Sequence, residues 1–231
     1  MSVKKLEEMF ALQERLNIET NGKEWKNGVS KNGKTINWTR CIYMECCEAI
    51  DSFPWKHWRD ISADPNWQNI KIEVVDIWHF FMSLGIAEFT KDTVKPVEMM
   101  KNLPSYDKFI KDESQNIGDV PTELIIEKFE KLINKMTTPA KNHFTTSIND
   151  FLELGMMIGM TLSEIHKLYI GKNCLNRLRQ NHGYKEGKYI KIWNGKEDNV
   201  VMQNLLQKTP DITFDKLYIN LENIYKRIAN S

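Results

Sequence analysis

The sequence of 231 residues lacks the features that mark membrane-spanning or secreted proteins. No apolar run approaches the roughly 18 residues needed to span a bilayer, and the first residues lack the apolar core of a signal peptide. The four cysteines form no CxxC pair. We interpret them as small buried hydrophobic residues in a reducing compartment, rather than as disulfide partners or zinc ligands. These absences predict a cytoplasmic protein.

An excess of charge of one sign is also lacking. The 32 Lys and Arg residues nearly balance the 31 Asp and Glu residues, which leaves a formal net charge of +1. Proteins that bind nucleic acids or membrane surfaces through bulk charge carry a strong excess of one sign. We therefore expect neither a nucleic acid nor a membrane as a partner.

Apolar residues recur at helical spacing along nearly the whole chain, and no stretch alternates for long as a strand does. The sequence therefore predicts an all-α protein that forms a helical bundle. We expect one domain over residues 1–231, with its core in residues 1–89 and 148–231. Residues 90–147 are less regular and are expected to form a variable or mobile helical segment. The expected helices span about residues 3–19, 37–53, 65–88, 121–136, 149–170, 171–180, 200–207 and 214–229.

Two short acidic repeats lie in the second and third expected helices. Glu45 and Glu48 are three residues apart, and so are Glu73 and Asp76. Residues three apart share one face of a helix, so each pair presents two carboxylates side by side. If the two helices pack together, four carboxylates meet in an apolar setting and need compensating charge. Hard divalent cations prefer oxygen ligands, so the pattern favours a magnesium site over a buried salt-bridge network.

Spacing alone does not identify such a site. Glu127 and Glu130 have the same spacing, but their helix has ordinary amphipathic surroundings and a solvated face explains them. The two acidic repeats differ because apolar residues flank them on both sides. This difference in context is the basis for the metal-site hypothesis.

The first expected helix carries an apolar stripe that continues, at helical spacing, into Gln13 and Asn17. Two interpretations stay open. The end of the helix emerges into solvent, or the two amides face a pocket in which they pair with the edge of a base. Trp55 and Trp58 also allow two interpretations: they stack on a base, or they pack in a core.

A basic strip marks the last third of the chain. Lys172, Asn176 and Arg179 recur on one helix face, and Lys196 is among the lysines that follow in glycine-containing loops. Arg and Lys both suit phosphate oxygens, and a solvated basic face is the alternative. Together with a magnesium site, such a strip is what a nucleoside polyphosphate requires.

Six local strings resemble the dimeric dUTPases of the all-α nucleoside triphosphate pyrophosphatase superfamily. The acidic pairs resemble the superfamily signature, and the C-terminal strings are more specific to the dUTPase branch. The resemblance covers most of the chain, with little in residues 90–147, and implies the helical bundle of this superfamily. The strings are CIYMECCE (41–48), IDSFPWKHW (50–58), EVVDIWHF (73–80), YIGKN (169–173), RQNHGYKEG (179–187) and WNGKEDN (193–199).

The resemblance implies a homodimeric enzyme that hydrolyses dUTP, and dUDP as well, to dUMP. Pyrophosphate or phosphate would be released, and the reaction would limit the incorporation of uracil into DNA. Two or three Mg²⁺ ions would activate the attacking water. Glu45 and Glu48 would have catalytic roles, with Glu48 orienting and deprotonating this water. The metal ligands would be Glu45, Glu48, Glu73 and Asp76.

The resemblance also implies the substrate contacts. Gln13 and Asn17 would read the uracil, and Trp58 or Trp55 would wall its pocket. The residues that would bind the sugar and the phosphates are Lys172, Asn176, Arg179, Tyr184, Lys196 and Asn199.

Three other functions remain as alternatives. The first is a housecleaning pyrophosphatase of the same superfamily with a broader choice of base. The second is a non-catalytic helical binding protein that has kept the fold. The third is an oxygen-activating di-metal protein, which typically needs Glu-x-x-His ligand pairs and is disfavoured by the Glu/Glu and Glu/Asp pairs here.

Overall fold

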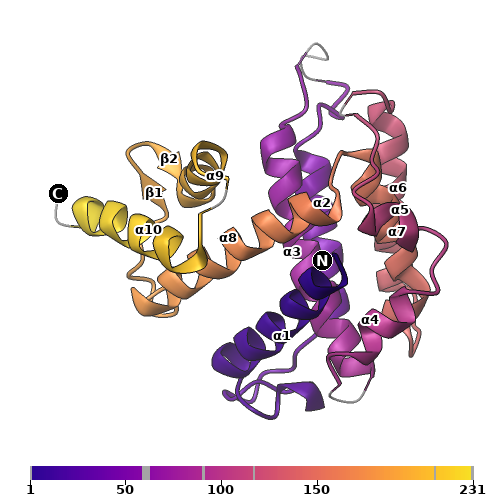
Figure 1. Ribbon diagram of the computed structural model, residues 1–231, viewed down its shortest axis with the longest axis horizontal. Coiled ribbons are helices and arrows are strands. Elements are labelled where there is room, and N and C mark those ends of the chain that lie inside the picture. The colour runs from indigo at the N-terminus through magenta and orange to yellow at the C-terminus, as the bar shows by residue number, and fades with distance from the viewer. Residues whose placement is uncertain (1, 59–62, 90–91, 117, 211, 230–231) are drawn as a thin grey trace. The chain divides into compact units, whose positions relative to one another are not determined.

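The computed structural model describes residues 2–58, 63–89, 92–116, 118–210 and 212–229, and α-helices dominate this part of the chain (Figure 1). The all-α fold class expected from the sequence is confirmed. The chain divides into two compact units, Met1–Ile165 and His166–Ser231, which are described in turn. Among the described residues, no helix combines the length and the apolar character needed to cross a membrane.

Within its described residues, the first unit contains seven helices, a 3₁₀ turn and the start of an eighth helix. Asparagines begin two of the helices: Asn37 accepts a hydrogen bond from the backbone N of Arg40, and Asn66 accepts one from that of Asn69. Such caps satisfy backbone N–H groups that have no partner within the helix. The elements are α1 (Ser2–Asn21), η1 (Trp25–Asn27), α2 (Trp38–Asp51), α3 (Trp67–Glu88), α4 (Lys95–Met100), α5 (Tyr106–Ile110), α6 (Thr122–Thr137), α7 (His143–Met157) and the first turn of α8 (Leu162–Asn181).

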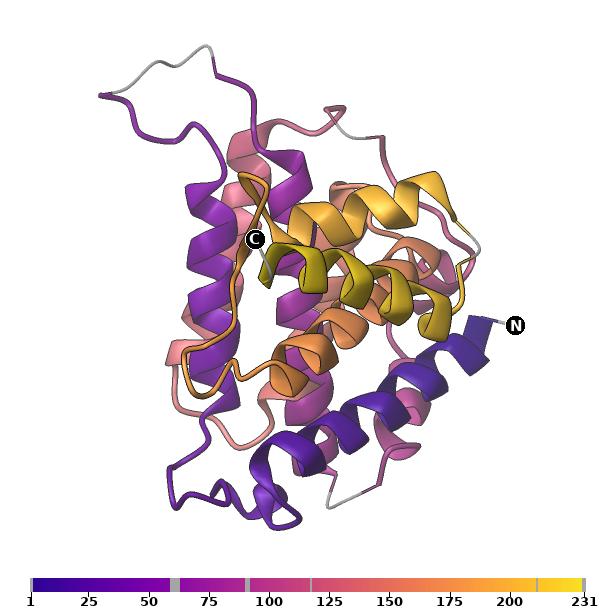
Figure 2. The same ribbon diagram turned by 90° about the vertical axis from the view of Figure 1, so that its left-hand side faces the viewer.

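Helix α3 lies at the centre of this unit, as its nearly all-round apolar sequence requires. It packs along α2, and α1 and α7 also contact it (Figures 1 and 2). Trp78 of α3 is fully buried. Its ring stacks on that of Phe151 in α7 at 5.5 Å and meets that of Phe10 in α1 edge to face at 5.8 Å. One aromatic side chain therefore joins three helices of the core.

The second unit contains most of α8, the short antiparallel hairpin of β1 (Ile192–Trp193) and β2 (Lys196–Glu197), α9 (Asp198–Lys208) and α10 (Phe214–Ala229). α8 and α9 cross closely at Gly171. A Cβ atom added to Gly171 would lie 2.5 Å from the sulfur of Met202 and 2.7 Å from Cδ1 of Leu206. The absence of a side chain at this position therefore permits the close approach of the two helices.

The predicted division between the helices of residues 149–170 and 171–180 is wrong. α7 ends at Met157 and α8 runs without a break from Leu162 to Asn181. Gly159 stops α7 because it adopts a positive φ of 72°, which glycine tolerates without a Cβ penalty. Gly171 stays helical for the packing reason given above. The helices expected at residues 3–19, 37–53, 65–88, 121–136, 200–207 and 214–229 are confirmed within a few residues.

The segment of residues 90–147 contains α4, α5, α6 and the start of α7, while residues 90, 91 and 117 lie outside the described part. α6 packs against α2 and α7. Its apolar face includes Ile125, Phe129 and Leu132, which are fully buried. The single-domain organisation, with a variable or mobile segment at residues 90–147, stays a prediction.

Candidate active site

Three carboxylates from α2 and α3 meet in the first unit. Glu45 lies on α2, and Glu73 and Asp76 lie one turn apart on α3. Each offers an oxygen atom, and these three atoms lie within 4.8 Å of one another. The packing of α2 on α3 thus brings together two helices that each carry an acidic repeat, which is the arrangement that the sequence predicts.

Burial and mutual repulsion make this cluster electrostatically costly. The pKa of Glu45 is raised to about 8, with burial as the largest cause, followed by the charges of Asp76, Glu73 and Glu48 and by a hydrogen bond with Glu73. A hydrogen bond between two carboxyl groups needs a proton on one of them. Without a cation to balance the charge, the cluster therefore favours the protonated form of Glu45.

The donor set fits a hard divalent cation. Carboxylate oxygens that converge from two helices are the ligands that magnesium and calcium prefer. A cation among them would replace the shared proton and offset the repulsion that raises the pKa of Glu45. All three potential ligands identified among the described residues are carboxylates, and none is a histidine or a cysteine.

Glu48 differs from the other three acidic residues. It is exposed, and it does not belong to the group whose oxygens lie within 4.8 Å. Its charge nevertheless contributes to the raised pKa of Glu45, one turn earlier on α2. Glu48 therefore lies at the solvent side of the cluster, with more freedom to move than Glu73, which is buried.

Gln13 and Asn17 of α1 are buried and do not emerge into solvent. Gln13 Nε2 and Asn17 Nδ2 both donate to Ser83 Oγ, at 3.0 and 2.9 Å, and Gln13 Oε1 lies 2.7 Å from His79 Nδ1. The amides thus contact each other at 3.3 Å and contact α3 through two polar side chains. Of the two interpretations of this polar stripe, solvation at a helix end is wrong.

The amide network and the acidic cluster share one face of α3. Asp76, His79 and Ser83 recur at i, i+3 and i+7, a spacing that places side chains on a single helix face. Ser83 follows Asp76 by about two turns, or roughly 10 Å along the helix axis. The sequence analysis does not assign His79 and Ser83 to the site, although their helical spacing from Asp76 is present in the sequence.

The two tryptophans of the predicted pocket wall lie after α2 and remain accessible. Trp58 is 63% exposed and Trp55 is 41% exposed. Their rings meet edge to face at 5.7 Å. Neither ring packs in a core, so both leave aromatic surface available for stacking.

In the second unit, four of the six residues predicted to bind sugar and phosphates lie together. Lys172 Nζ donates to Asn199 Oδ1 at 3.2 Å, and Arg179 Nη2 lies 3.4 Å from the same oxygen. Arg179 Nη1 lies 3.4 Å from Asn176 Oδ1. Tyr184 lies beside this group, with its ring 5.7 Å from the guanidinium of Arg179. Lys196 is exposed and lines a cavity with Trp193.

Asp198 is a residue of this cluster that the sequence did not reveal. It is fully buried at the start of α9 and accepts hydrogen bonds from Arg179 Nε at 2.9 Å and from Tyr189 Oη at 2.9 Å. Burial raises the pKa of Tyr189, and the Asp198 charge raises it further. The guanidinium of Arg179 is therefore already compensated by a carboxylate. The sequence does not single out Asp198, because Glu186 and Glu197 are also acidic residues of the same stretch.

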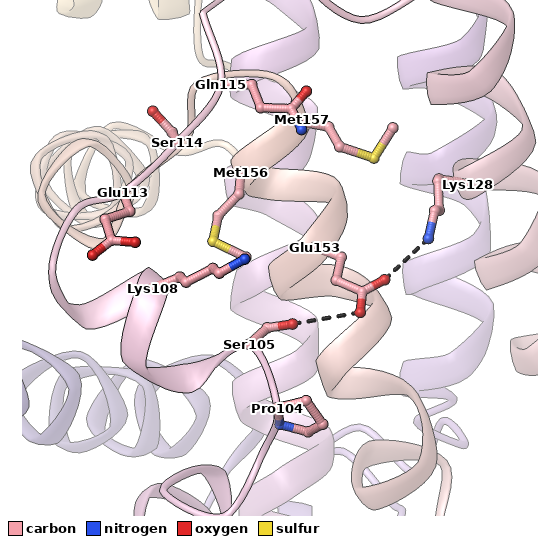
Figure 3. Close-up of a pocket in the computed structure, with 10 residues that line it drawn as sticks. All are labelled: Pro104, Ser105, Lys108, Glu113, Ser114, Gln115, Lys128, Glu153, Met156 and Met157. Atoms are coloured by element: carbon pink, nitrogen blue, oxygen red, sulfur yellow. Dashed lines mark hydrogen bonds and ion pairs between the residues drawn. The ribbon is translucent and has the colours of Figure 1, made fainter.

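A cavity of about 610 Å³ lies in the first unit beside α5, α6 and α7, and none of the predicted site residues lines it (Figure 3). Glu153 projects into it and is held by Lys128 at 3.0 Å and by Ser105 Oγ at 3.4 Å. The predicted site residues therefore form separate groups outside this lining, one where α2 and α3 meet in the first unit and one within the second unit.

Comparison with models of known protein families gives a match over most of the chain. Residues 5–184 match the sequence model of a family described as dUTPase. This range includes all four acidic residues, both amides of α1 and the part of α8 that carries Lys172, Asn176 and Arg179. A search of curated proteins found no match.

Proposed function

The chain belongs to the all-α dUTPase family and is a dUTP diphosphatase, and we propose that it attacks the α-phosphorus of dUTP with the help of magnesium. The products would be dUMP and pyrophosphate, and dUDP would give dUMP and phosphate. This reaction would limit the incorporation of uracil into DNA. The alternative activities, a broader choice of base or binding without catalysis, have no specific observation in their favour.

The observation that carries this proposal is the shared face of α3. Asp76 lies in the acidic cluster, and Ser83, about two turns further on, holds the amides of Gln13 and Asn17. A nucleotide needs a site for its phosphates and a site for its base at a fixed separation. One rigid helix that carries both groups supplies that separation.

Metal ions are a general requirement of dUTPases, and Glu45, Glu73 and Asp76 are the residues that would hold them here. We propose two or three magnesium ions, with Glu48 completing the ligand set. Bound magnesium would polarise the phosphate oxygens and lower the pKa of a nucleophilic water. The protein contributes preorganised carboxylates, because α2 and α3 hold them in place before the substrate binds.

Glu48 is proposed as the group that orients the attacking water and takes its proton, with Glu45 beside it as the second catalytic carboxylate. Its exposed position at the edge of the cluster leaves room for a water molecule next to its carboxylate. A general base must lie within hydrogen-bond reach of the proton that it removes. The three more closely gathered carboxylates are better placed to hold cations.

The substrate contacts are proposed as follows. Gln13 and Asn17 read the uracil, and the accessible ring of Trp58 covers the base, with Trp55 beside it. Polar residues of the second unit bind the sugar and the phosphates; these are Lys172, Asn176, Arg179, Tyr184, Lys196 and Asn199. We further propose a cytoplasmic homodimer that needs no nucleic-acid partner.

Hydrolysis of dUTP, dCTP, dTTP and UTP, each with and without magnesium, tests the proposal. We expect rapid release of pyrophosphate from dUTP only, and only when magnesium is present. Comparable rates on all four nucleotides would contradict the base selection. Full activity after removal of divalent cations with a chelator would contradict the metal requirement.

A further inference from the structure

The hydroxyl of Ser83 uses all of its hydrogen-bonding capacity inside the protein. Its oxygen accepts from Gln13 Nε2 at 3.0 Å and from Asn17 Nδ2 at 2.9 Å, and it donates to the backbone carbonyl of His79 at 2.9 Å. A serine hydroxyl has one proton and two lone pairs. Because the proton is committed to the carbonyl, the hydroxyl can only accept from the two amides. Ser83 is fully buried, so water does not compete for these bonds.

This arrangement distinguishes the nitrogen of each amide from its oxygen. When the amide nitrogen faces Ser83 Oγ, its N–H donates to a lone pair of the hydroxyl. If the amide were flipped, its oxygen would face that lone pair instead, and the two acceptors would repel each other. Gln13 is held from its other end as well, because its Oε1 lies 2.7 Å from His79 Nδ1. The network therefore favours one of the two flipped orientations of each amide.

The orientation matters because an amide that is free to flip does not distinguish uracil from cytosine. On the uracil edge, an amide oxygen accepts from N3–H while the amide nitrogen donates to a carbonyl oxygen. On the cytosine edge, N3 is an acceptor and the exocyclic amino group is a donor, so the same amide pairs after a rotation of 180°. Selection of uracil therefore requires that something other than the base sets the flip.

We propose that Ser83 is a positioning residue that selects uracil over cytosine by setting the amide orientation of Gln13 and Asn17. The inference rests on the proposed function, in which these two amides read the base. One N–H and one oxygen lone pair of Asn17 have no hydrogen-bond partner among the described residues. This donor and acceptor are the groups that Ser83 orients toward the imide edge.

The experiment compares kcat/KM for dUTP and dCTP in the wild type and in Ser83→Ala. Each net hydrogen bond is worth roughly a factor of two to ten, so we expect the loss of two to lower the dUTP:dCTP ratio about 4- to 100-fold. The rate with dUTP falls and the rate with dCTP rises or holds. Ser83→Cys, whose thiol accepts hydrogen bonds weakly, changes the ratio in the same direction and covers the case in which the alanine variant does not fold.

Ser147→Ala is the matched control. Ser147 is also a fully buried helical serine, and its Oγ has no hydrogen-bond partner in the part of the chain that the structure describes. We expect this variant to keep the wild-type ratio. A purely structural role of Ser83 would lower both rates together and leave the ratio unchanged, which would overturn the inference.

Asn17→Leu separates this inference from the proposed function. If Asn17→Leu lowers the dUTP:dCTP ratio and Ser83→Ala does not, the amides read the base but Ser83 does not set them, and the inference alone is wrong. If the wild type shows no preference for dUTP, or if Asn17→Leu leaves the ratio unchanged, the proposed reading of the base is itself wrong. A lower dUTP:dCTP ratio in both Asn17→Leu and Ser83→Ala, with an unchanged ratio in Ser147→Ala, supports the positioning role of Ser83.

Discussion

Arg179 donates two hydrogen bonds to the carboxylate of Asp198, from Nε at 2.9 Å and from Nη2 at 2.8 Å. This two-point geometry adds both energy and directional specificity to the ion pair. Both side chains are almost completely buried. Arg179, which the basic strip suggests as a phosphate ligand, is thus also paired with Asp198 in the protein interior. This ion pair fixes the start of α9.

We predict that Asp198→Asn destabilises the protein by about 3–5 kcal/mol, because it leaves a buried guanidinium without its counter-charge. Urea denaturation followed by circular dichroism measures this change. Lys196→Ala is the control: Lys196 is exposed, and its removal should change the free energy of unfolding by less than about 0.5 kcal/mol. Equal stability of the two variants would show that the ion pair contributes nothing.

Magnesium is predicted to stabilise the wild type through the acidic cluster. At a concentration one hundred times its Kd, a ligand that binds only the folded state adds about 2.7 kcal/mol to the free energy of unfolding. Asp76→Asn should lose most of this stabilisation, because it removes one of the three gathered carboxylates. Thermal unfolding at several magnesium concentrations measures the effect.

Glu127→Gln provides the control for this prediction. Glu127 has the same spacing to Glu130 on α6 as the acidic repeats have, but both residues are exposed. The variant should keep the full response to magnesium. An equal response of Asp76→Asn and Glu127→Gln would remove the acidic cluster as the metal site.

The sequence predicted the acidic cluster well because its cause is local. A spacing of three residues sets the helix face, and apolar neighbours indicate that the face is buried. The same reasoning treats Glu45 and Glu48 alike, yet only Glu45 joins Glu73 and Asp76. Which of two carboxylates on one face reaches the neighbouring helix depends on how the helices cross, and the spacing carries no information about that crossing.

Contacts between distant positions were harder to predict. Asp198 meets Arg179 across 19 positions of the sequence, and Ser83 meets Gln13 across 70. No periodicity links such residues, because the folding of the chain alone brings them together. Two glycines show the same limit of sequence-based prediction. Gly159 ends a helix, whereas Gly171 lies within a helix and permits a close crossing. The residue type alone does not distinguish these two roles.

Acid is predicted to weaken the contact between α6 and α7 through Asp150. Burial alone would raise the pKa of this carboxyl, but hydrogen bonds and charges from Lys131 and Lys135 outweigh it and lower the pKa overall. A lowered pKa means that the stabilisation is present above the unfolded-state value of about 3.9 and is lost as pH falls through the lower folded-state value. The unfolding free energy of the wild type should therefore exceed that of Asp150→Asn by about 1 kcal/mol at pH 7, since both lysines are partly exposed and screened by water.

The difference between the wild type and Asp150→Asn should shrink as pH falls below the unfolded-state pKa and disappear once the carboxyl is protonated in the folded state as well. Urea denaturation between pH 2.5 and 7 measures it. Asp107→Asn is the control, since Asp107 is exposed and forms no ion pair among the described residues. A difference that stays constant over the whole pH range would mean that charge is not the source of the stabilisation.

Glu48→Gln and Glu45→Gln are predicted to separate proton transfer from metal binding. Glu48 lies at the exposed edge of the cluster, whereas Glu45 is one of the three gathered carboxylates. Loss of a general base lowers kcat by about 10²- to 10⁴-fold, so Glu48→Gln should lose activity by this factor and keep most of the stabilisation by magnesium. Glu45→Gln should lose both, because its carboxylate is needed before any water can be activated. Steady-state kinetics with dUTP, together with thermal unfolding in the presence of magnesium, measures both properties.

The contradicting outcome is that Glu48→Gln loses the response to magnesium as fully as Glu45→Gln does. In that case Glu48 acts mainly as a metal ligand, and another residue is the general base.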